Sequence, residues 1–123
     1  MRSNALINDL SERLSLRPNN AAAALGTGNW RAGHGQFASI DPTTGEVLGY
    51  AGRATHEDVE AVVFSACEAF LRWRQMPAPL RGLFVRDLAE ALRSAKNDLA
   101  LLIALEVGKI KSEAEGEVQE MID

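Results

Sequence analysis

A change of apolar period at Thr55 is the feature that most constrains how this chain folds. Beyond Thr55, apolar side chains recur every three or four residues, the spacing of a helix that buries one face. This first stripe consists of Val59, Val62, Val63, Ala66, Phe70 and Trp73. Thr55 is a favoured N-cap residue, and Asp58 follows three positions later, as a capping box requires. We therefore predict a helix that begins after Thr55 and continues until Pro77 ends it, with Trp73 buried.

Two further helices follow directly. Pro77 and Pro79 end the first helix and start the second, because proline fits the first turn of a helix but not its interior. The apolar stripe of the second helix consists of Leu80, Leu83, Phe84, Leu88, Leu92 and Ala95. The third helix comes after Lys96-Asn97 and ends at Gly108, since glycine is the usual C-cap residue.

A fourth helix is predicted to open at Ser112, which forms a second capping-box pattern with Glu115. Its apolar residues are Val118, Met121 and Ile122. No glycine, asparagine or proline follows them, so this helix lacks a C-terminal signal. We therefore expect the chain to stop within a longer pattern rather than at a domain boundary.

The residues before Thr55 predict one more helix, a connector and a β-hairpin. Residues 4–16 place apolar side chains at helical spacing, and residues 17–29 (RPNNAAAALGTGN) form a connector rich in turn residues. Residues 37–40 and 47–50 are short β-prone runs, and residues 41–45 (DPTTG) between them have turn chemistry. We predict a hairpin with a loop of five or six residues.

The composition is that of a soluble globular protein. Hydrophobic residues make up 46% and charged residues 24% of the 123 residues, which suits one domain with a core. The net charge of -4 argues against a nucleic-acid surface. No apolar run is long enough to span a bilayer, so no membrane partner is expected. The single cysteine permits no internal disulfide, and Asp9 and Glu12 argue against a transit peptide, so the expected location is the cytoplasm.

Individual motifs do not define a chemical mechanism. Gly108-Lys109 lacks the second glycine and the Ser or Thr of a phosphate-binding loop. Residues 33–38 match G-x-G-x-x-A, but they lead into a predicted strand, whereas a dinucleotide-binding turn opens a helix. Cys67 has no His or Lys placed to activate it and is expected to pack beside the first stripe. Glu106 adjoins an apolar cluster, where a carboxylate must be neutralised, hydrogen-bonded or bound to a cation.

The order and the amino-acid sequences of four segments nevertheless resemble the N-terminal part of the aldehyde dehydrogenase superfamily. They are SIDPTTGEVLG (39–49), ATHEDVEAVV (54–63), AFLRWRQMPAPLRG (69–82) and LALLIALEVGKIKSEAEGEVQEMID (99–123). The resemblance covers residues 28–123. Within the superfamily, the GKI, EGEVQE and MID segments and Gly28-Asn29-Trp30 are similar to the antiquitin branch, the α-aminoadipic semialdehyde (piperideine-6-carboxylate) dehydrogenases.

This resemblance implies an α/β fold for the parent protein, of which this chain is an α+β N-terminal segment with one β-hairpin followed by about four helices. Residues 1–27 would form an N-terminal helix and linker, and residues 28–123 the truncated start of the coenzyme-binding domain. The implied activity is NAD-dependent oxidation of α-aminoadipic semialdehyde to the acid in lysine breakdown, by a homodimer or homotetramer. The residues leave the choice between NAD and NADP open.

The resemblance assigns no catalytic residue and no NAD-binding residue to this chain, because the nucleophile, the base and the nicotinamide site lie further along in the family. The chain alone is therefore expected to be inactive and not to bind NAD. Glu120, the last letter of GEVQE, matches the glutamate that holds the polar end of the semialdehyde substrate. Ser39, Ile40 and Glu106 match a monovalent-cation site, with two backbone carbonyls and one carboxylate as ligands.

A second interpretation is a non-catalytic helical module that binds a partner or a dehydrogenase subunit. The apolar faces of its four helices would otherwise remain exposed on a chain of this length.

Overall fold

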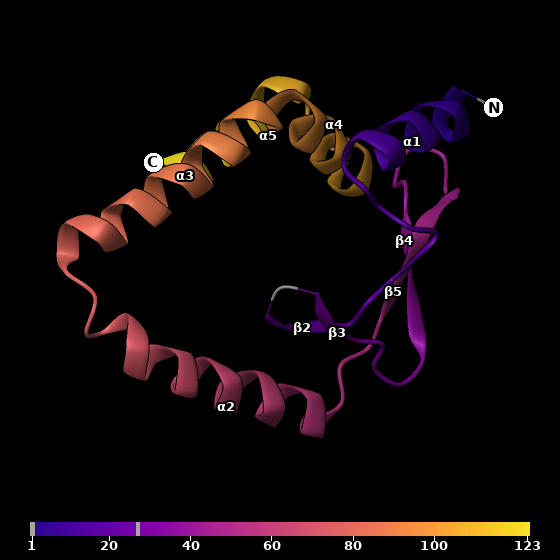
Figure 1. The fold of residues 1–123 in the computed structure, drawn as a ribbon. Helices are drawn as coiled ribbons and strands as arrows, with labels where there is room; N and C mark the ends of the chain where they lie inside the picture. The colour runs from indigo at the N-terminus through magenta and orange to yellow at the C-terminus, as the bar shows by residue number, and fades with distance from the viewer. Residues whose placement is uncertain (1, 27) are drawn as a thin grey trace.

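The computed structural model describes residues 2–26 and 28–123; Met1 and Thr27, which fall in the predicted N-terminal helix and linker, lie outside them. Within these ranges the chain begins with helix α1 (Arg2–Arg13), passes through five short strands and ends in four helices. Figure 1 shows α2 running outward from the strands, α3 returning, α4 lying beside α1, and α5 running back along α3. None of the helices in the described ranges combines the length and apolar character that a bilayer crossing requires.

The predicted hairpin is confirmed. Strands β4 (Gln36–Ile40) and β5 (Val47–Gly52) pair antiparallel. In the connecting loop, Gly45 adopts a φ of 73°, and its N–H donates to the Asp41 carbonyl over 2.8 Å. The buried Asp41 carboxylate accepts a hydrogen bond from the Thr43 N–H, which lowers the pKa of Asp41 below its ordinary value. Local turn chemistry therefore fixes this hairpin, as the DPTTG segment predicted.

The connector predicted over residues 17–29 contains two strands that the sequence did not reveal. Strand β1 (Asn19–Asn20) pairs parallel with β5, so the first sheet has the order β1-β5-β4. Strand β2 (Ala23–Gly26) pairs antiparallel with β3 (Asn29–Arg31) in a second, two-stranded sheet. Alanine and asparagine are poor strand formers, so these strands depend on their pairing partners rather than on intrinsic propensity.

Helix α2 (His56–Trp73) begins as predicted, with a reciprocal capping box between Thr55 and Asp58. The Thr55 N–H donates to Asp58 Oδ2 over 2.9 Å, the Thr55 hydroxyl donates to the same oxygen over 3.0 Å, and the Asp58 N–H donates to Thr55 Oγ1 over 3.1 Å. The bond from the Thr55 N–H is the main reason that the pKa of Asp58 is lowered. A buried carboxylate is thereby kept ionised at the helix start, where the helix dipole also favours it.

The next helices also follow the predicted boundaries, apart from one cap. Helix α3 (Ala78–Ser94) starts right after Pro77, and α4 (Lys96–Val107) ends at Gly108, which has the predicted left-handed conformation with a φ of 75°. Helix α5 (Lys111–Ile122) starts one residue earlier than the predicted cap, and its N-cap is Ile110. The predicted Ser112–Glu115 capping box is therefore wrong, because Ser112 already lies inside the first helical turn.

The core of the helical part lies between α4 and α5. Its buried members are Ala100, Ala114, Val118 and Ile122, and partly buried residues of α3 and α4 pack around them. A smaller core anchors α1, where Leu10 is fully buried and Ile7 nearly so. The last residues of α5 thus contribute to packing and are not a frayed end.

Helices α2 and α3, in contrast, leave their apolar stripes exposed. Asp58 is the one buried residue among the described residues of α2, and α3 has none. Trp73 remains 38% exposed, so the prediction of a buried tryptophan is wrong; its ring lies 6.0 Å from that of Phe84 between ring centroids. The total accessible surface is 8895 Å², whereas a compact monomer of 13.3 kDa would expose about 6,450 Å².

Candidate functional site

The structure brings together two of the three residues predicted for a cation site. Ser39 lies on β4 and Glu106 in the last turn of α4, and the Ser39 hydroxyl donates a hydrogen bond to Glu106 Oε1 over 2.5 Å. Ile40 follows Ser39 at the end of β4, with half of its surface exposed. Ser39 and Glu106 also line a cleft of about 400 Å³ between α1, the β4–β5 hairpin and α4.

The charged side chains that line this cleft are one carboxylate, Glu106, and one guanidinium, Arg17. In the part of the chain that the structure describes, no three His, Cys, Asp or Glu side chains gather into a metal-binding group. A cation beside Glu106 would therefore depend on backbone oxygens of Ser39 and Ile40 for its remaining ligands. The Glu106 carboxylate accepts the Ser39 hydroxyl, but Glu106 is exposed, so the expectation that apolar surroundings force it to find a partner is wrong. The cation site stays a prediction.

Glu120, the predicted substrate anchor, lies on the exposed side of α5. The opposite side of the helix is buried through Val118 and Ile122. Two other glutamates of α5 are paired: Lys109 binds Glu117, and Lys111 Nζ lies 3.3 Å from Glu115 Oε1. Glu113, like Glu120, has no ion pair with a described residue. Glu120 forms no ion pair with any described residue, so its charge is available to a cationic group.

The rotation of α5 is fixed by side chains that sequence reasoning did not single out. Lys96 Nζ, in the first turn of α4, donates to Gln119 Oε1 over 2.7 Å. Gln119 Nε2 in turn donates to Asp123 Oδ1 over 2.8 Å. These contacts and the buried stripe together hold the neighbouring Glu120 toward solvent. No spacing rule in the sequence connects Lys96 with Gln119, since the two are 23 residues apart.

The described residues do not fit a dinucleotide. Residues 33–38 run from the turn after β3 into β4, so they open a strand and not the helix that would receive a pyrophosphate. Gly108 caps the end of α4, which is the unfavourable end of a helix for an anion. Cys67 is exposed on α2, so the prediction that it packs beside the first stripe is wrong. No step of NAD chemistry is therefore assigned to these residues.

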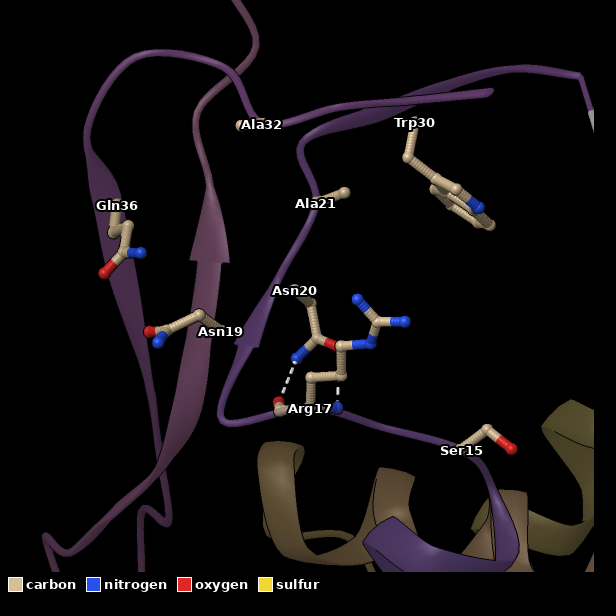
Figure 2. A pocket seen from close by; sticks show the side chains of 8 residues that line it. All are labelled: Ser15, Arg17, Asn19, Asn20, Ala21, Trp30, Ala32 and Gln36. Atoms are coloured by element: carbon tan, nitrogen blue, oxygen red, sulfur yellow. Dashed lines mark hydrogen bonds between the residues drawn. The ribbon is translucent and has the colours of Figure 1, made fainter. Parts of the chain in front are cut away.

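A second cleft, which the sequence did not predict, lies near the N-terminal strand. Its volume is about 480 Å³. Figure 2 shows the side chains that line it: Ser15, Arg17, Asn19, Asn20, Ala21, Trp30, Ala32 and Gln36. They come from the segment after α1, from β1 and the residue after it, from β3 and the residue after it, and from β4.

The arrangement of hairpin and helices is also found in a much longer solved protein. The crystal structure of HpcC from Thermus thermophilus matches 96% of this chain and 24% of its own, with a TM-score of 0.77 and 27% sequence identity. Together with the mixed helices and strands, this likeness places the chain in the α/β class of the aldehyde dehydrogenase fold.

The family follows from the sequence match. Residues 30–123 match the aldehyde dehydrogenase family, and the chain belongs to that family. Among its relatives, aldehyde dehydrogenase family 7 member A1 of Pisum sativum is 43% identical over 96 residues, which are 78% of this chain and 19% of that protein. Alpha-aminoadipic semialdehyde dehydrogenase of Bos taurus is 39% identical over 97 residues, 78% of this chain and 18% of that protein. The chain thus spans about a fifth of the length of these relatives.

Proposed function

We propose that this chain is the N-terminal portion of an NAD-dependent aldehyde dehydrogenase that oxidises α-aminoadipic semialdehyde to its carboxylic acid during lysine breakdown. The observation that carries this proposal is the family match over residues 30–123, with relatives named family 7 aldehyde dehydrogenase and alpha-aminoadipic semialdehyde dehydrogenase. The parent would work in the cytoplasm as a homodimer or homotetramer.

Glu120 is the residue of this portion that would contact the substrate. The semialdehyde carries an ammonium group at the end opposite its aldehyde, and a carboxylate without an ion pair is a suitable partner for it. The fixed rotation of α5, through Gln119 and its contacts with Lys96 and Asp123, supports a role that needs a constant position. Glu120 would therefore orient the substrate and take no part in bond making.

Ser39, Ile40 and Glu106 would bind a monovalent cation that joins β4 to α4. Their proposed role is structural, because the cleft that they border lies between the hairpin, α1 and the end of α4. The catalytic thiol, the base and the nicotinamide site are not assigned to any residue here. The chain by itself is accordingly proposed to be inactive.

The proposal is tested by grafting. Residues 28–123 would replace the matching segment of the Pisum sativum relative, and NAD-dependent oxidation of α-aminoadipic semialdehyde would be measured. A chimera with activity within about tenfold of the relative supports the proposal, since a misplaced segment costs about a hundredfold or more. A folded chimera that binds NAD but does not oxidise the semialdehyde would refute it. Circular dichroism and NAD titration separate that result from misfolding.

A second candidate function rests on a separate observation, the exposed apolar face of α2 and α3. Its members include Val63, Phe64, Phe70, Phe84, Val85 and Leu88, each at least half exposed. The accessible surface exceeds that of a compact monomer by about 2,400 Å², the area of a large protein–protein interface. We infer that the chain, taken alone, acts as a helical module that binds a partner or dehydrogenase subunit through this face.

Light scattering on the purified chain checks the second candidate. Phe84→Ser with Leu88→Lys should disperse any assembly and remove capture by the subunits of the Pisum sativum relative. Glu113→Lys, at an exposed position of α5 outside this face, is the matched control for a change of charge. A wild-type chain that stays monomeric and captures no subunit contradicts this function.

A further inference from the structure

The cleft of Figure 2 has the size and the charge of a site for a small anion. Its volume of about 480 Å³ lies in the range of small-molecule pockets. The chain has 17 acidic residues and a net charge of -4, yet none of the eight lining residues is acidic. The one charged member is Arg17, so the cleft is locally positive on a negative protein.

Hydrogen bonds with Asn20 hold the backbone of Arg17, whereas the Arg17 guanidinium makes no hydrogen bond with a described residue. The Arg17 N–H donates to Asn20 Oδ1 over 3.1 Å, and Asn20 Nδ2 donates back to the Arg17 carbonyl over 2.7 Å. Asn20 Nδ2 also lies 3.3 Å from the Tyr50 carbonyl, which ties this turn to β5. Among the residues that the structure describes, the Arg17 guanidinium has neither a hydrogen-bond acceptor nor a carboxylate partner. The backbone at Arg17 is therefore fixed, and the five N–H donors of its guanidinium remain for a ligand.

Trp30 supplies an aromatic surface beside this guanidinium. Its side chain is 66% exposed, more than most large apolar side chains of the chain. Figure 2 shows the indole ring and the Arg17 guanidinium on one side of β1, whereas the amides of Asn19 and Gln36 lie across that strand, away from the indole. An exposed indole offers a stacking surface for a planar ring.

We propose that this cleft binds a small organic anion in which a planar ring is joined to a carboxylate or phosphate. The Arg17 guanidinium pairs with two oxygens of the anionic group, the geometry for which arginine is suited. The ring stacks on Trp30. A cationic ligand has no carboxylate to meet among the lining residues, and a purely apolar ligand leaves the guanidinium unused. This site does not use Ser39, Ile40, Glu106 or Glu120, although Arg17 and Asn20 also border the cleft of Ser39 and Glu106. The proposal does not rest on the proposed dehydrogenase function.

Fluorescence of Trp30 tests the site directly. Trp73→Phe removes the other tryptophan and keeps an aromatic ring against Phe84, so that emission reports on Trp30 alone. The probes are AMP and benzoate, which distinguish a nucleoside monophosphate from an aromatic carboxylate. Their neutral counterparts, adenosine and benzamide, lack the anionic group. Calorimetry on the unmodified chain provides a second reading of the same binding.

At least one of the two anions should saturate the Trp30 signal below about 1 mM and bind about tenfold more tightly than its neutral counterpart. Arg17→Gln should remove that tenfold preference and leave the fold unchanged by circular dichroism, since the side chain is exposed. Arg72→Gln, at an exposed arginine of α2, is the matched control and should bind as the parent does. Raising the salt concentration should weaken anion binding but not adenosine binding.

Three results would overturn the proposal. The first is the absence of saturable binding by either anion below about 10 mM in both fluorescence and calorimetry. The second is equal affinity for an anion and its neutral counterpart, which would leave Arg17 without a role. The third is an equal loss in Arg17→Gln and Arg72→Gln, which would show general charge attraction and not a site.

Discussion

Ser39 on β4 and Glu106 on α4, 67 positions apart in the sequence, are joined by a hydrogen bond from the serine hydroxyl to Glu106 Oε1. The contact connects the β4–β5 hairpin to the C-terminal end of α4. Ile40, the residue after Ser39, is the last residue of β4.

Stability should therefore depend on the monovalent cation present. A cation at five times its Kd stabilises the folded state by about 1 kcal/mol, which raises the Tm of a domain of this size by roughly 4 °C. We expect a higher Tm in sodium or potassium chloride than in choline chloride at equal ionic strength, measured by circular dichroism. Glu106→Gln should abolish the difference, and Glu113→Gln should preserve it. A difference that survives in Glu106→Gln would show that Glu106 is not a ligand.

Glu120→Ala should change substrate preference in the grafted enzyme. A hydrogen bond to a charged group contributes roughly 1.5–3 kcal/mol, so kcat/KM for α-aminoadipic semialdehyde should fall about 10- to 100-fold. Oxidation of a simple aliphatic aldehyde should change little, because it has no ammonium group. Glu113→Ala, also on an exposed part of α5, serves as control. Equal losses on both aldehydes would show that Glu120 does not anchor the substrate.

Leu10→Ala and Leu88→Ala compare a buried leucine with an exposed one. Leu10, on α1, is fully buried, so its truncation to alanine should cost about 2–5 kcal/mol of unfolding free energy. Leu88 is 61% exposed on α3 and should lie within about 0.5 kcal/mol of the wild type. Urea unfolding followed by circular dichroism measures both. Equal losses at the two positions would show that the α3 face is covered in solution.

The capping box predicts how stability depends on pH. The pKa of Asp58 is lower in the folded than in the unfolded state, so the unfolded chain binds more protons in the acid range. The stabilisation by Asp58 is complete at neutral pH and is lost as the pH falls below about 4. Urea unfolding at about pH 7 and about pH 3 should therefore show a smaller pH dependence in Asp58→Asn than in the wild type.

Glu57→Gln is the control for that comparison, because Glu57 is exposed in the same helical turn and outside the capping box. Asp41 has a lowered pKa as well, so part of the acid dependence should remain in Asp58→Asn. A pH dependence that is unchanged in Asp58→Asn would mean that the capping box does not contribute to acid stability.

Features determined by neighbouring residues were predictable from the sequence. The DPTTG turn, the Thr55–Asp58 box and the Gly108 cap each depend on contacts within a few positions. Strand β1 was missed because its partner in β5 lies about 30 positions away, as the pairing of Asn19 with Tyr50 shows. The Ser112 cap was wrong because Ala114 is fully buried against α4, and the helix that places it there starts earlier.

The residues of the candidate site were also predictable only where neighbouring residues determine them. Glu106 stood out in the sequence as a carboxylate beside an apolar cluster, but its hydrogen-bonding partner on β4 follows from tertiary packing alone. The role of Glu120 came from resemblance and has no pattern of its own. No sequence pattern placed Arg17 and Trp30 in one site, because two sheets and the turn after α1 must form before these side chains border one cleft.

Helix α2 contacts the rest of the molecule mainly through β2 and buries little of its surface. The Ser65 hydroxyl donates to the Leu25 carbonyl over 2.9 Å, and Asp58 is the one buried side chain in the described part of the helix. Its amide hydrogens should therefore exchange through local opening, at a free energy well below that of global unfolding. Helices α4 and α5 share a buried core and should exchange only when the whole chain unfolds. We therefore expect α2 to open before the α4–α5 core.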